Sequence, residues 1–229
     1  MAYSNWQIFM VELVGTFVLV VFATGSIVYD EKLGNPYGLW FAAIAPFFAL
    51  MIGVYSFGKI SLAHFNPAVT IGFFITGHIT KIQIIWYFLA EIIGALLGSL
   101  FVLNFIGTES HLGANFPNHD YSIFLILSVE VLASGLLLAT IFMVVYFKRL
   151  NRFSGVLIGG MVGLDILFFG PLSGASMNPA RSLAPAIFSG AIEDLWIYLT
   201  APFIASILVP FLFRKKFFIS RMGGNIGNP

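Results

Sequence analysis

The chain has 229 residues, of which 59% are hydrophobic and 9% charged, and its formal net charge is +1. Its mean hydropathy of +0.96 lies far outside the range of water-soluble globular domains. The absence of cysteine excludes disulfides, a thiolate nucleophile and any cysteine-based metal site. These values predict an integral membrane protein.

Six apolar runs are long enough to cross a membrane as helices, since a spanning helix needs roughly 20 mainly apolar residues. The expected spans are 6–28, 39–58, 83–106, 121–147, 155–171 and 195–213. The first run is longer than a signal-peptide core and has no basic region before it, so we expect it to remain as a span. The sequence therefore predicts an all-α membrane protein.

Two further apolar pieces, 66–77 and 178–189, begin with Asn-Pro-Ala within the stretches SLAHFNPAVT and GASMNPARSL. Asparagine is a favoured helix N-cap and proline is favoured at the first helical position. Both pieces are too short to span, and two proline-kinked spanning helices would still need about 20 apolar residues each. We expect two half-helices whose N-termini lie inside the membrane.

The two halves of the chain resemble each other. Span one reads MVELVGTFVLV and span four reads SVEVLASGLLL, and an Asn-Pro-Ala follows each of them. Because each half contains three spans, the copies must enter the membrane from opposite sides. This predicts an inverted repeat with halves of approximately 1–118 and 119–229.

Positive charge is unevenly distributed between the loops. The basic residues that a six-span topology places on one side are Lys59, Lys81, Lys148, Arg149, Arg152, Arg214, Lys215, Lys216 and Arg221. By the positive-inside rule this side is cytoplasmic, with both termini inside. Arg181 is the basic residue that this topology leaves unexplained.

The two half-helix N-termini are predicted to place partial positive charge and hydrogen-bonding groups near the middle of the membrane. Each carries roughly half a positive charge, so cations and hydronium would meet a barrier that a neutral molecule would not. Irregular backbone at this depth must be buried or line a water-filled cavity, so Ser61–Phe65 and Ser173–Met177 are expected to offer carbonyl oxygens to a pore. If each asparagine oxygen caps its helix, the amide NH2 is free to donate to a passing oxygen. Arg181, within a membrane segment, would face the same aqueous path.

On HFNPAVT, GASMNPARS, the Glu-x-x-Gly-Thr of span one, AEIIGALLGS and WIYLTAPFIAS, the chain resembles the aquaporin and glycerol-facilitator (major intrinsic protein) family. The resemblance implies the aquaporin fold, one pore in each subunit, a homotetramer and no cofactor or metal. It assigns the pore triplets to Asn66, Pro67, Ala68, Asn178, Pro179 and Ala180.

The resemblance also places a selectivity filter. The aromatic position of the family falls at Pro46, with Phe47 beside it, and we favour Phe47, which a shift of one residue would bring to the pore. The other filter positions are Ile166, Ala175 and Arg181. Ile166 and Ala175 make the opening wider and more apolar than that of strict water pores. The pair is similar to that of plant vacuolar members, which pass water with ammonia or urea.

Several residues are expected to support the pore backbone. The resemblance implies that two buried glutamates accept hydrogen bonds from the loop N–H groups, although intramembrane acids can also carry protons. The supporting residues are Glu12, Glu130, Ala63, His64, Gly174 and Ser176. The chain departs from the family at Leu62, where a small glycine is usual, and at Glu91, where glutamine is usual.

The combined prediction is a single channel domain, residues 1–229, that passes water together with small uncharged solutes and excludes protons and ions. It is not an enzyme, and its partners are these permeants, membrane lipid and further copies of itself, with no nucleic acid. We expect a multi-pass protein of the cell membrane. The alternatives are a facilitator that prefers glycerol, urea or ammonia, a proton-coupled transporter, and a closed junctional protein.

Overall fold

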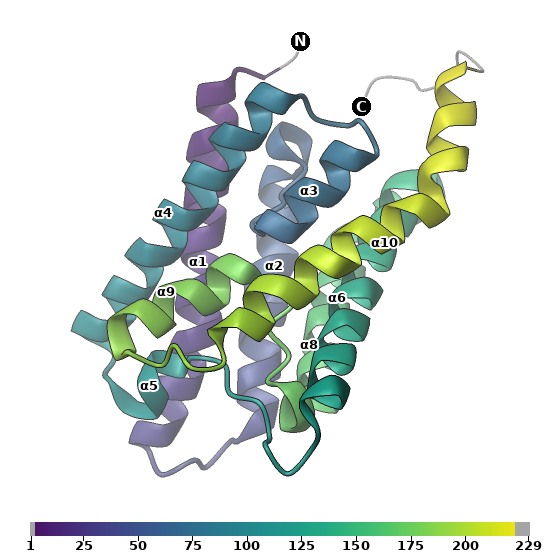
Figure 1. Cartoon of the computed structure of the whole chain (residues 1–229). Helices are drawn as coiled ribbons and strands as arrows, with labels where there is room; N and C mark the ends of the chain where they lie inside the picture. The colour runs from purple at the N-terminus through teal and green to yellow at the C-terminus, as the bar shows by residue number, and fades with distance from the viewer. Residues whose placement is uncertain (1–2, 223–229) are drawn as a thin grey trace.

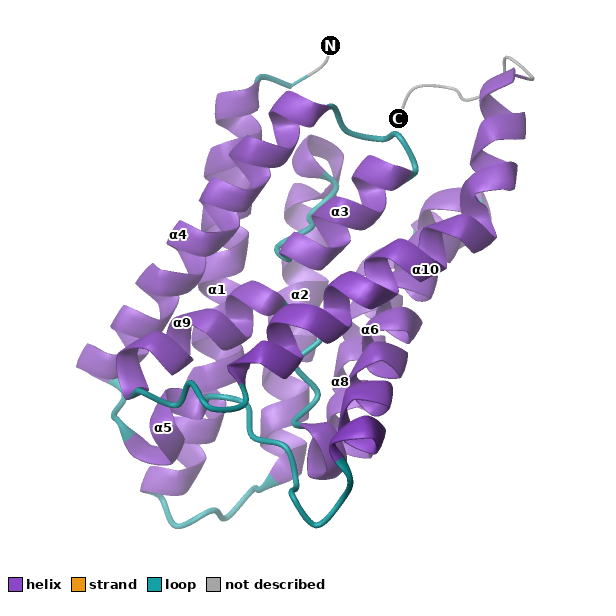
Figure 2. Ribbon diagram, in the orientation of Figure 1, coloured by secondary structure: helices purple, strands orange, loops and turns teal. Residues whose placement is uncertain are grey.

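The computed structural model describes residues 3–222, with side chains up to residue 213. Within that range the regular secondary structure is helical, and no strand is present (Figure 2). Six helices of the described chain are long and apolar enough to cross a membrane, which confirms the predicted number. They are α1 (Asn5–Lys32), α2 (Leu39–Ser61), α4 (Lys81–Phe105), α6 (Ile123–Tyr146), α8 (Ser154–Ser173) and α10 (Leu195–Met222).

Polar capping residues fix where two of these helices begin. Ser4 and Gln7 form a capping box at the start of α1, and Thr80 and Gln83 form another at the start of α4. These helices therefore begin one and two residues before the apolar runs that predicted them.

The two Asn-Pro-Ala segments form short helices, α3 (Pro67–Ile75) and α9 (Pro179–Ser189). Figure 1 shows α3 in the upper half of the bundle and α9 in the lower half, with their N-termini close to the middle. The prediction of two half-helices that enter from opposite faces is confirmed. In the same view α1 begins and α10 ends at the upper end of the bundle, as six spans require.

Glycines bring pairs of long helices into close contact. A Cβ added at Gly94 would lie 2.5 Å from the Leu13 carbonyl oxygen, which places the backbones of α4 and α1 against each other. A Cβ at Gly159 would lie 2.6 Å from the Phe47 carbonyl oxygen, which does the same for α8 and α2. Small residues commonly allow this kind of close approach between membrane helices.

Two short elements were not predicted. α5 (Glu109–Gly113) is a tight turn in which Ser110, His111 and Leu112 all have positive φ, and α7 (Lys148–Asn151) is a single turn. The chain from Ala114 to Ser122 then crosses the lower end of the bundle before α6 begins (Figure 1). The basic side chains of Arg214, Lys215, Lys216 and Arg221 lie outside the described side chains.

Candidate functional site

Each half-helix begins with an asparagine that caps it. Asn66 Oδ1 accepts a hydrogen bond from the Ala68 backbone N–H at 2.9 Å. Asn178 Oδ1 accepts from the Ala180 and Arg181 N–H groups at 3.0 and 3.4 Å. The side-chain oxygen therefore satisfies N–H groups that would otherwise have no partner at the start of a helix.

The same asparagines join the two halves of the chain. Asn66 Nδ2 donates to the Met177 carbonyl oxygen and Asn178 Nδ2 donates to the Phe65 carbonyl oxygen, both at 2.8 Å. From the sequence we expected the whole amide NH2 to be free for a permeant, but one hydrogen of each is used in this reciprocal pair. One hydrogen on each asparagine remains for the pore.

The two loops that lead into the half-helices share an unusual backbone. In each loop the first, second and fourth residues after the preceding helix have positive φ, a conformation that costs a non-glycine residue free energy. These residues are Leu62, Ala63 and Phe65 in the first loop and Gly174, Ala175 and Met177 in the second. We call them the inner and the outer loop, after the topology predicted from the sequence. The equal pattern means that both loops turn into the membrane interior in the same way.

Two fully buried glutamates hold these backbones in place. Glu12 of α1 accepts from the Ser61 hydroxyl at 2.5 Å and from the His64 and Phe65 N–H groups at 3.0 and 2.7 Å. Glu130 of α6 accepts from the Ser173 hydroxyl at 2.8 Å and from the Met177 N–H at 2.7 Å. Both side chains are completely shielded, and their oxygens serve as hydrogen-bond acceptors for the loops.

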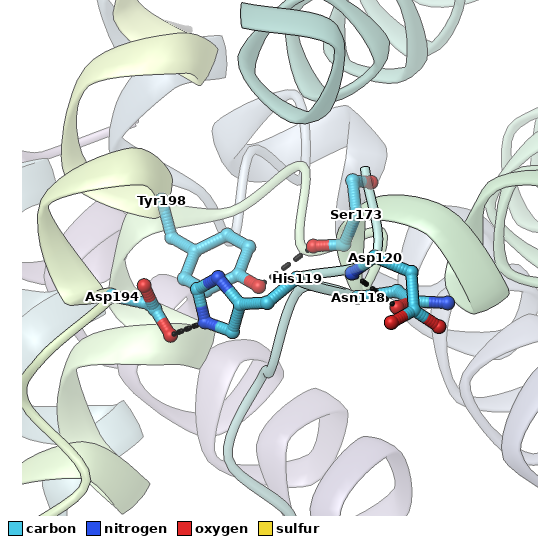
Figure 3. A network of polar contacts seen from close by, with 6 residues as sticks. All are labelled: Asn118, His119, Asp120, Ser173, Asp194 and Tyr198. Atoms are coloured by element: carbon cyan, nitrogen blue, oxygen red, sulfur yellow. Dashed lines mark hydrogen bonds and ion pairs between the residues drawn. The ribbon is translucent and has the colours of Figure 1, made fainter. Parts of the chain in front are cut away.

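Two tyrosines complete the equivalent frames. The Tyr87 hydroxyl of α4 donates to the Ser61 carbonyl oxygen at 2.5 Å, and the Tyr198 hydroxyl of α10 donates to the Ser173 carbonyl oxygen at 2.6 Å. Figure 3 shows the second of these contacts. Each tyrosine thus ties the end of one spanning helix to another.

Three side chains form a network on the inner side only. His64 Nδ1 lies 2.8 Å from the Thr70 hydroxyl, which donates to Glu91 Oε1 at 2.6 Å. The Asn66 N–H donates to the same Glu91 oxygen at 3.2 Å. The His64 ring is stacked between Phe73 and Tyr87, with ring centroids 4.5 and 4.2 Å apart. This arrangement holds His64 in a fixed position.

A different network serves the outer side, and its centre is Asn115. Asn115 Nδ2 donates to the Gly174 carbonyl oxygen at 2.7 Å. Asn115 Oδ1 accepts from the Ser182 hydroxyl at 2.6 Å and from the guanidinium of Arg181. Ser182 in turn contacts the Ser176 hydroxyl. A residue from the connection between the two halves therefore contacts the second triplet loop and the buried arginine.

The connection that carries Asn115 is attached at further points. The Asn118 N–H donates to the Leu172 carbonyl oxygen at 3.0 Å. His119 Nε2 lies 2.9 Å from Asp194 Oδ2, just before α10 (Figure 3). We call residues 114–122 the outer strap, because they cross the end of the bundle next to α9 and α10.

A cavity of about 40 Å³, counted as the space open to the centre of a water-sized sphere, lies between the helices and the two loops. Most of the lining is apolar and comes from α1, α2, α6 and α8, with side chains such as Leu19, Leu137 and Val162. The polar residues of the lining are His64, Asn66, Ser176, Asn178 and Arg181. The lining therefore combines a largely apolar surface with a few hydrogen-bonding groups, and both triplet asparagines are among them.

The predicted filter positions meet at this cavity with one exception. Pro46, Ile166, Ala175 and Arg181 all line it. Phe47, which we favoured over Pro46, is not in the lining, and a Cβ added at Gly159 would lie 3.2 Å from its ring. The geometry therefore favours Pro46 and places Phe47 in the contact between α2 and α8.

The remaining predicted residues divide into lining and support. Ala63 lies in the cavity wall with His64, whereas Gly174 forms the turn and its carbonyl oxygen is bonded to Asn115. Four triplet residues are buried in the first turns of the half-helices rather than exposed to the cavity: Pro67, Ala68, Pro179 and Ala180.

Sequence reasoning missed Asn115. It lies in a connection with no helix or strand pattern, and its partners are about 60 residues further along the chain. The adjoining sequence, Gly-Ala-Asn-Phe-Pro, is a turn-like composition that carries no sign of a long-range contact.

An inverted pair of half-helices, meeting beside a cavity within six spanning helices, is the architecture of a membrane channel for small molecules. The family model described as "Major intrinsic protein" matches residues 1–213. The chain belongs to this family. It is an integral multi-pass membrane protein and a passive channel for water or small solutes.

Relatives and a solved structure support the assignment. The chain is 36% identical to "Probable aquaporin NIP7-1" of Arabidopsis thaliana over 91% of this chain and 76% of that protein. It is 34% identical to "Aquaporin TIP2-3" of the same plant over 93% and 88% of the two chains. The crystal structure of the aquaglyceroporin from Plasmodium falciparum matches with a TM-score of 0.79 and 25% identity, covering 93% of this chain and 96% of that one.

Proposed function

We propose that the channel conducts water as its main permeant together with small uncharged solutes, and that it excludes protons and ions. The observation that carries this proposal is that Asn66, Asn178 and Arg181 line one cavity whose remaining lining is mostly apolar. A water molecule can bond to these few polar groups but not to the apolar remainder of the lining. Chains of water that conduct protons would be interrupted beside the two half-helix N-termini.

The outer filter is formed by Pro46, Ile166, Ala175 and Arg181. Of these side chains, Arg181 alone donates hydrogen bonds, so the opening selects by charge and by size more than by hydrogen bonding. Arg181 is 8% exposed, and a buried guanidinium repels cations more strongly than an exposed one.

Osmotic shrinkage and swelling of proteoliposomes, run side by side on water, glycerol, urea and ammonia, test this proposal. We expect water flux well above that of protein-free vesicles, a smaller solute flux, and no current under voltage. Net current, or water flux that rises with a proton gradient, would favour a coupled transporter. Negligible flux in a folded preparation would favour a closed junctional protein.

A solute-preferring facilitator is the second candidate. Ile166 and Ala175 leave two filter positions without a donor, and the matching solved structure is an aquaglyceroporin. Glycerol flux comparable with water flux in the same assay would establish this alternative.

Arg181→Val tests the filter directly. We expect water flux to stay within about threefold of wild type, while proton leak rises by about tenfold or more because a buried unit charge is removed. Dye-loaded vesicles under an imposed potential report the leak. An unchanged leak would refute the filter role of Arg181.

The assembly and orientation belong to the same proposal. We propose a homotetramer surrounded by membrane lipid in the cell membrane, with both termini cytoplasmic and with inverted halves of approximately 1–118 and 119–229. Bulky apolar side chains are exposed on α1, α4 and α10, as lipid or neighbouring subunits would require, and examples are Phe22, Leu89 and Ile207. Chemical cross-linking in vesicles and labelling of termini from each side test these points.

A further inference from the structure

Asn115 of the outer strap is in an unusual position for a loop residue. It is 8% exposed, and each end of its amide is occupied. Its Nδ2 donates to the Gly174 carbonyl oxygen at the turn of the outer loop, at 2.7 Å. Its Oδ1 accepts from two groups of α9, the Arg181 guanidinium and the Ser182 hydroxyl.

Arg181 depends on this contact. Among the described residues, Asn115 Oδ1 is the one acceptor to which the Arg181 guanidinium donates a hydrogen bond. Glu130 accepts from the Ser173 hydroxyl and the Met177 N–H, and the described residues include no hydrogen bond between Glu130 and Arg181. The position of the Arg181 side chain at the cavity therefore depends on the position of the Asn115 side chain.

The acceptor is itself fixed from the opposite side. Because Nδ2 is bonded to Gly174, the amide cannot rotate without losing that contact. The strap is also fixed beyond Asn115, where the Asn118 N–H donates to Leu172 and His119 pairs with Asp194 (Figure 3). The outer strap is therefore a rigid support that reaches the arginine from outside α9.

Within the part of the chain that the structure describes, the inner half of the channel has no equivalent. Val69 follows the inner triplet at the position that Arg181 has after the outer triplet. The next residue, Thr70, donates its hydroxyl hydrogen bond to Glu91, which lies on the spanning helix α4. In the second half the Ser182 hydroxyl donates instead to Asn115, which lies in the outer strap. Arg181 is therefore bonded to the strap rather than to a spanning helix.

We propose that Asn115 is a positioning residue for the selectivity filter: its side-chain oxygen holds the Arg181 guanidinium at the cavity, and it thereby sets the width and the cation barrier of the outer opening. This inference rests on the proposed filter role of Arg181. Asn115 does not line the cavity, but it would contribute to the discrimination between water, larger solutes and protons.

Asn115→Ala is the primary test, with Asn115→Asp to separate position from charge. We expect Asn115→Ala to raise proton leak and the ratio of glycerol flux to water flux by roughly tenfold, the effect of one lost hydrogen bond to a charged group. In Asn115→Asp the carboxylate still accepts from Arg181, but it cancels the charge of Arg181 and has no donor for the Gly174 carbonyl oxygen. That variant should therefore raise proton leak to a similar extent and raise the glycerol-to-water ratio less than Asn115→Ala does.

Two controls make the result decisive. Asn104→Ala is a matched substitution at an exposed asparagine of α4 that donates within its own helix to Leu100, and it should behave as wild type. Arg181→Val, measured in the same vesicles, distinguishes the two levels of failure. If Arg181→Val changes neither ratio nor leak, the proposed filter is wrong. If Arg181→Val changes both, but folded Asn115→Ala with an unchanged melting temperature changes neither, the positioning role of Asn115 is wrong.

A general structural role would give a different outcome. If Asn115 only supports folding, Asn115→Ala would lower water and glycerol flux together and leave their ratio unchanged. That result would also overturn the proposal.

Discussion

The inner and outer membrane-entering loops have the same frame and different polar side chains. Ser61 and Ser173 both receive a tyrosine hydroxyl, and Glu12 and Glu130 both accept loop N–H groups. Asn66 and Asn178 then bond reciprocally to the opposite loop. Both halves therefore use the same set of hydrogen bonds to hold the loop that enters the membrane interior.

The two loops differ where a side chain bonds beyond this frame. His64, Thr70 and Glu91 form the inner network, whereas Ser176, Ser182 and Asn115 form the outer one. Arg181 has Val69 as its inner counterpart. The comparison indicates that the shared residues build the path, and that the differing residues make one end of it more selective than the other.

The largest expected effect tests whether the shared frame is equally important in both halves. Glu12→Leu leaves two N–H groups and a hydroxyl buried without an acceptor. Glu130→Leu leaves the Met177 N–H without one, and the Ser173 hydroxyl keeps only its longer contact, at 3.4 Å, with the Phe169 carbonyl oxygen. At about 1–3 kcal/mol for each unsatisfied group, Glu12→Leu should lose more than about 3 kcal/mol of folding free energy, and Glu130→Leu about 2 kcal/mol or more. Thermal melting followed by size-exclusion chromatography in detergent measures the loss.

Glutamine variants are the controls for this pair, because an amide oxygen still accepts hydrogen bonds. Glu12→Gln and Glu130→Gln should melt closer to wild type than the leucine variants. A severe loss for one leucine variant and none for the other would contradict the equivalence of the two frames.

The next prediction exploits a difference at the first residue of each loop. Gly174 has φ of +87°, and an added Cβ would lie 2.7 Å from the Tyr198 hydroxyl and 2.9 Å from the Phe116 carbonyl oxygen. Leu62 has the equivalent backbone with φ of +65°, but its side chain is 36% exposed. Gly174→Leu should therefore lose about 3 kcal/mol or more of folding free energy through overpacking and backbone strain.

The reciprocal change, Leu62→Gly, should alter the folding free energy by less than about 1 kcal/mol, since relief of backbone strain is offset by a more flexible unfolded chain. The same melting experiment compares the two. Equal losses would mean that the inner loop is as tightly enclosed as the outer one.

Much of the frame could be predicted from the sequence because its signals are local. Six apolar runs of sufficient length and two Asn-Pro starts specify the helices, and a glutamate early in each half indicates the repeat. These patterns depend on residues a few positions apart.

The parts that could not be predicted depend on contacts between distant segments. Whether Pro46 or Phe47 lines the cavity is decided by the close approach of α8 at Gly159, which no pattern within α2 records. The role of Asn115 arises from a connection without periodicity that meets residues far along the chain. The left-handed turn at Ser110 to Leu112 has no glycine before its end to indicate it.

Ile166→His sharpens the comparison at the selective end. Ile166 lines the cavity on α8, and histidine there adds a hydrogen-bonding group and narrows what can pass beside Arg181. We expect the ratio of glycerol flux to water flux to fall by roughly tenfold, as small differences in pocket shape allow. The four-solute swelling assay measures it, and Ile158→Val, which also borders the cavity, serves as a conservative control. A rise in the ratio of glycerol flux to water flux would contradict the assignment of Ile166 to the outer filter.

The smallest effect concerns Glu91, the acceptor of the inner network. Its Oε1 accepts from the Asn66 N–H and the Thr70 hydroxyl, while Oε2 is buried with no partner among the described residues. Glutamine retains an oxygen at the bonded position, so Glu91→Gln should change the folding free energy by less than about 1 kcal/mol and leave water flux unchanged. Glu91→Leu removes the acceptor for both donors and should lose about 2 kcal/mol or more. Melting and swelling measurements on the two variants separate the possibilities. Equal losses for both would mean that the charge of Glu91, rather than its acceptor geometry, supports the inner half-helix, and that the inner and outer networks differ in kind.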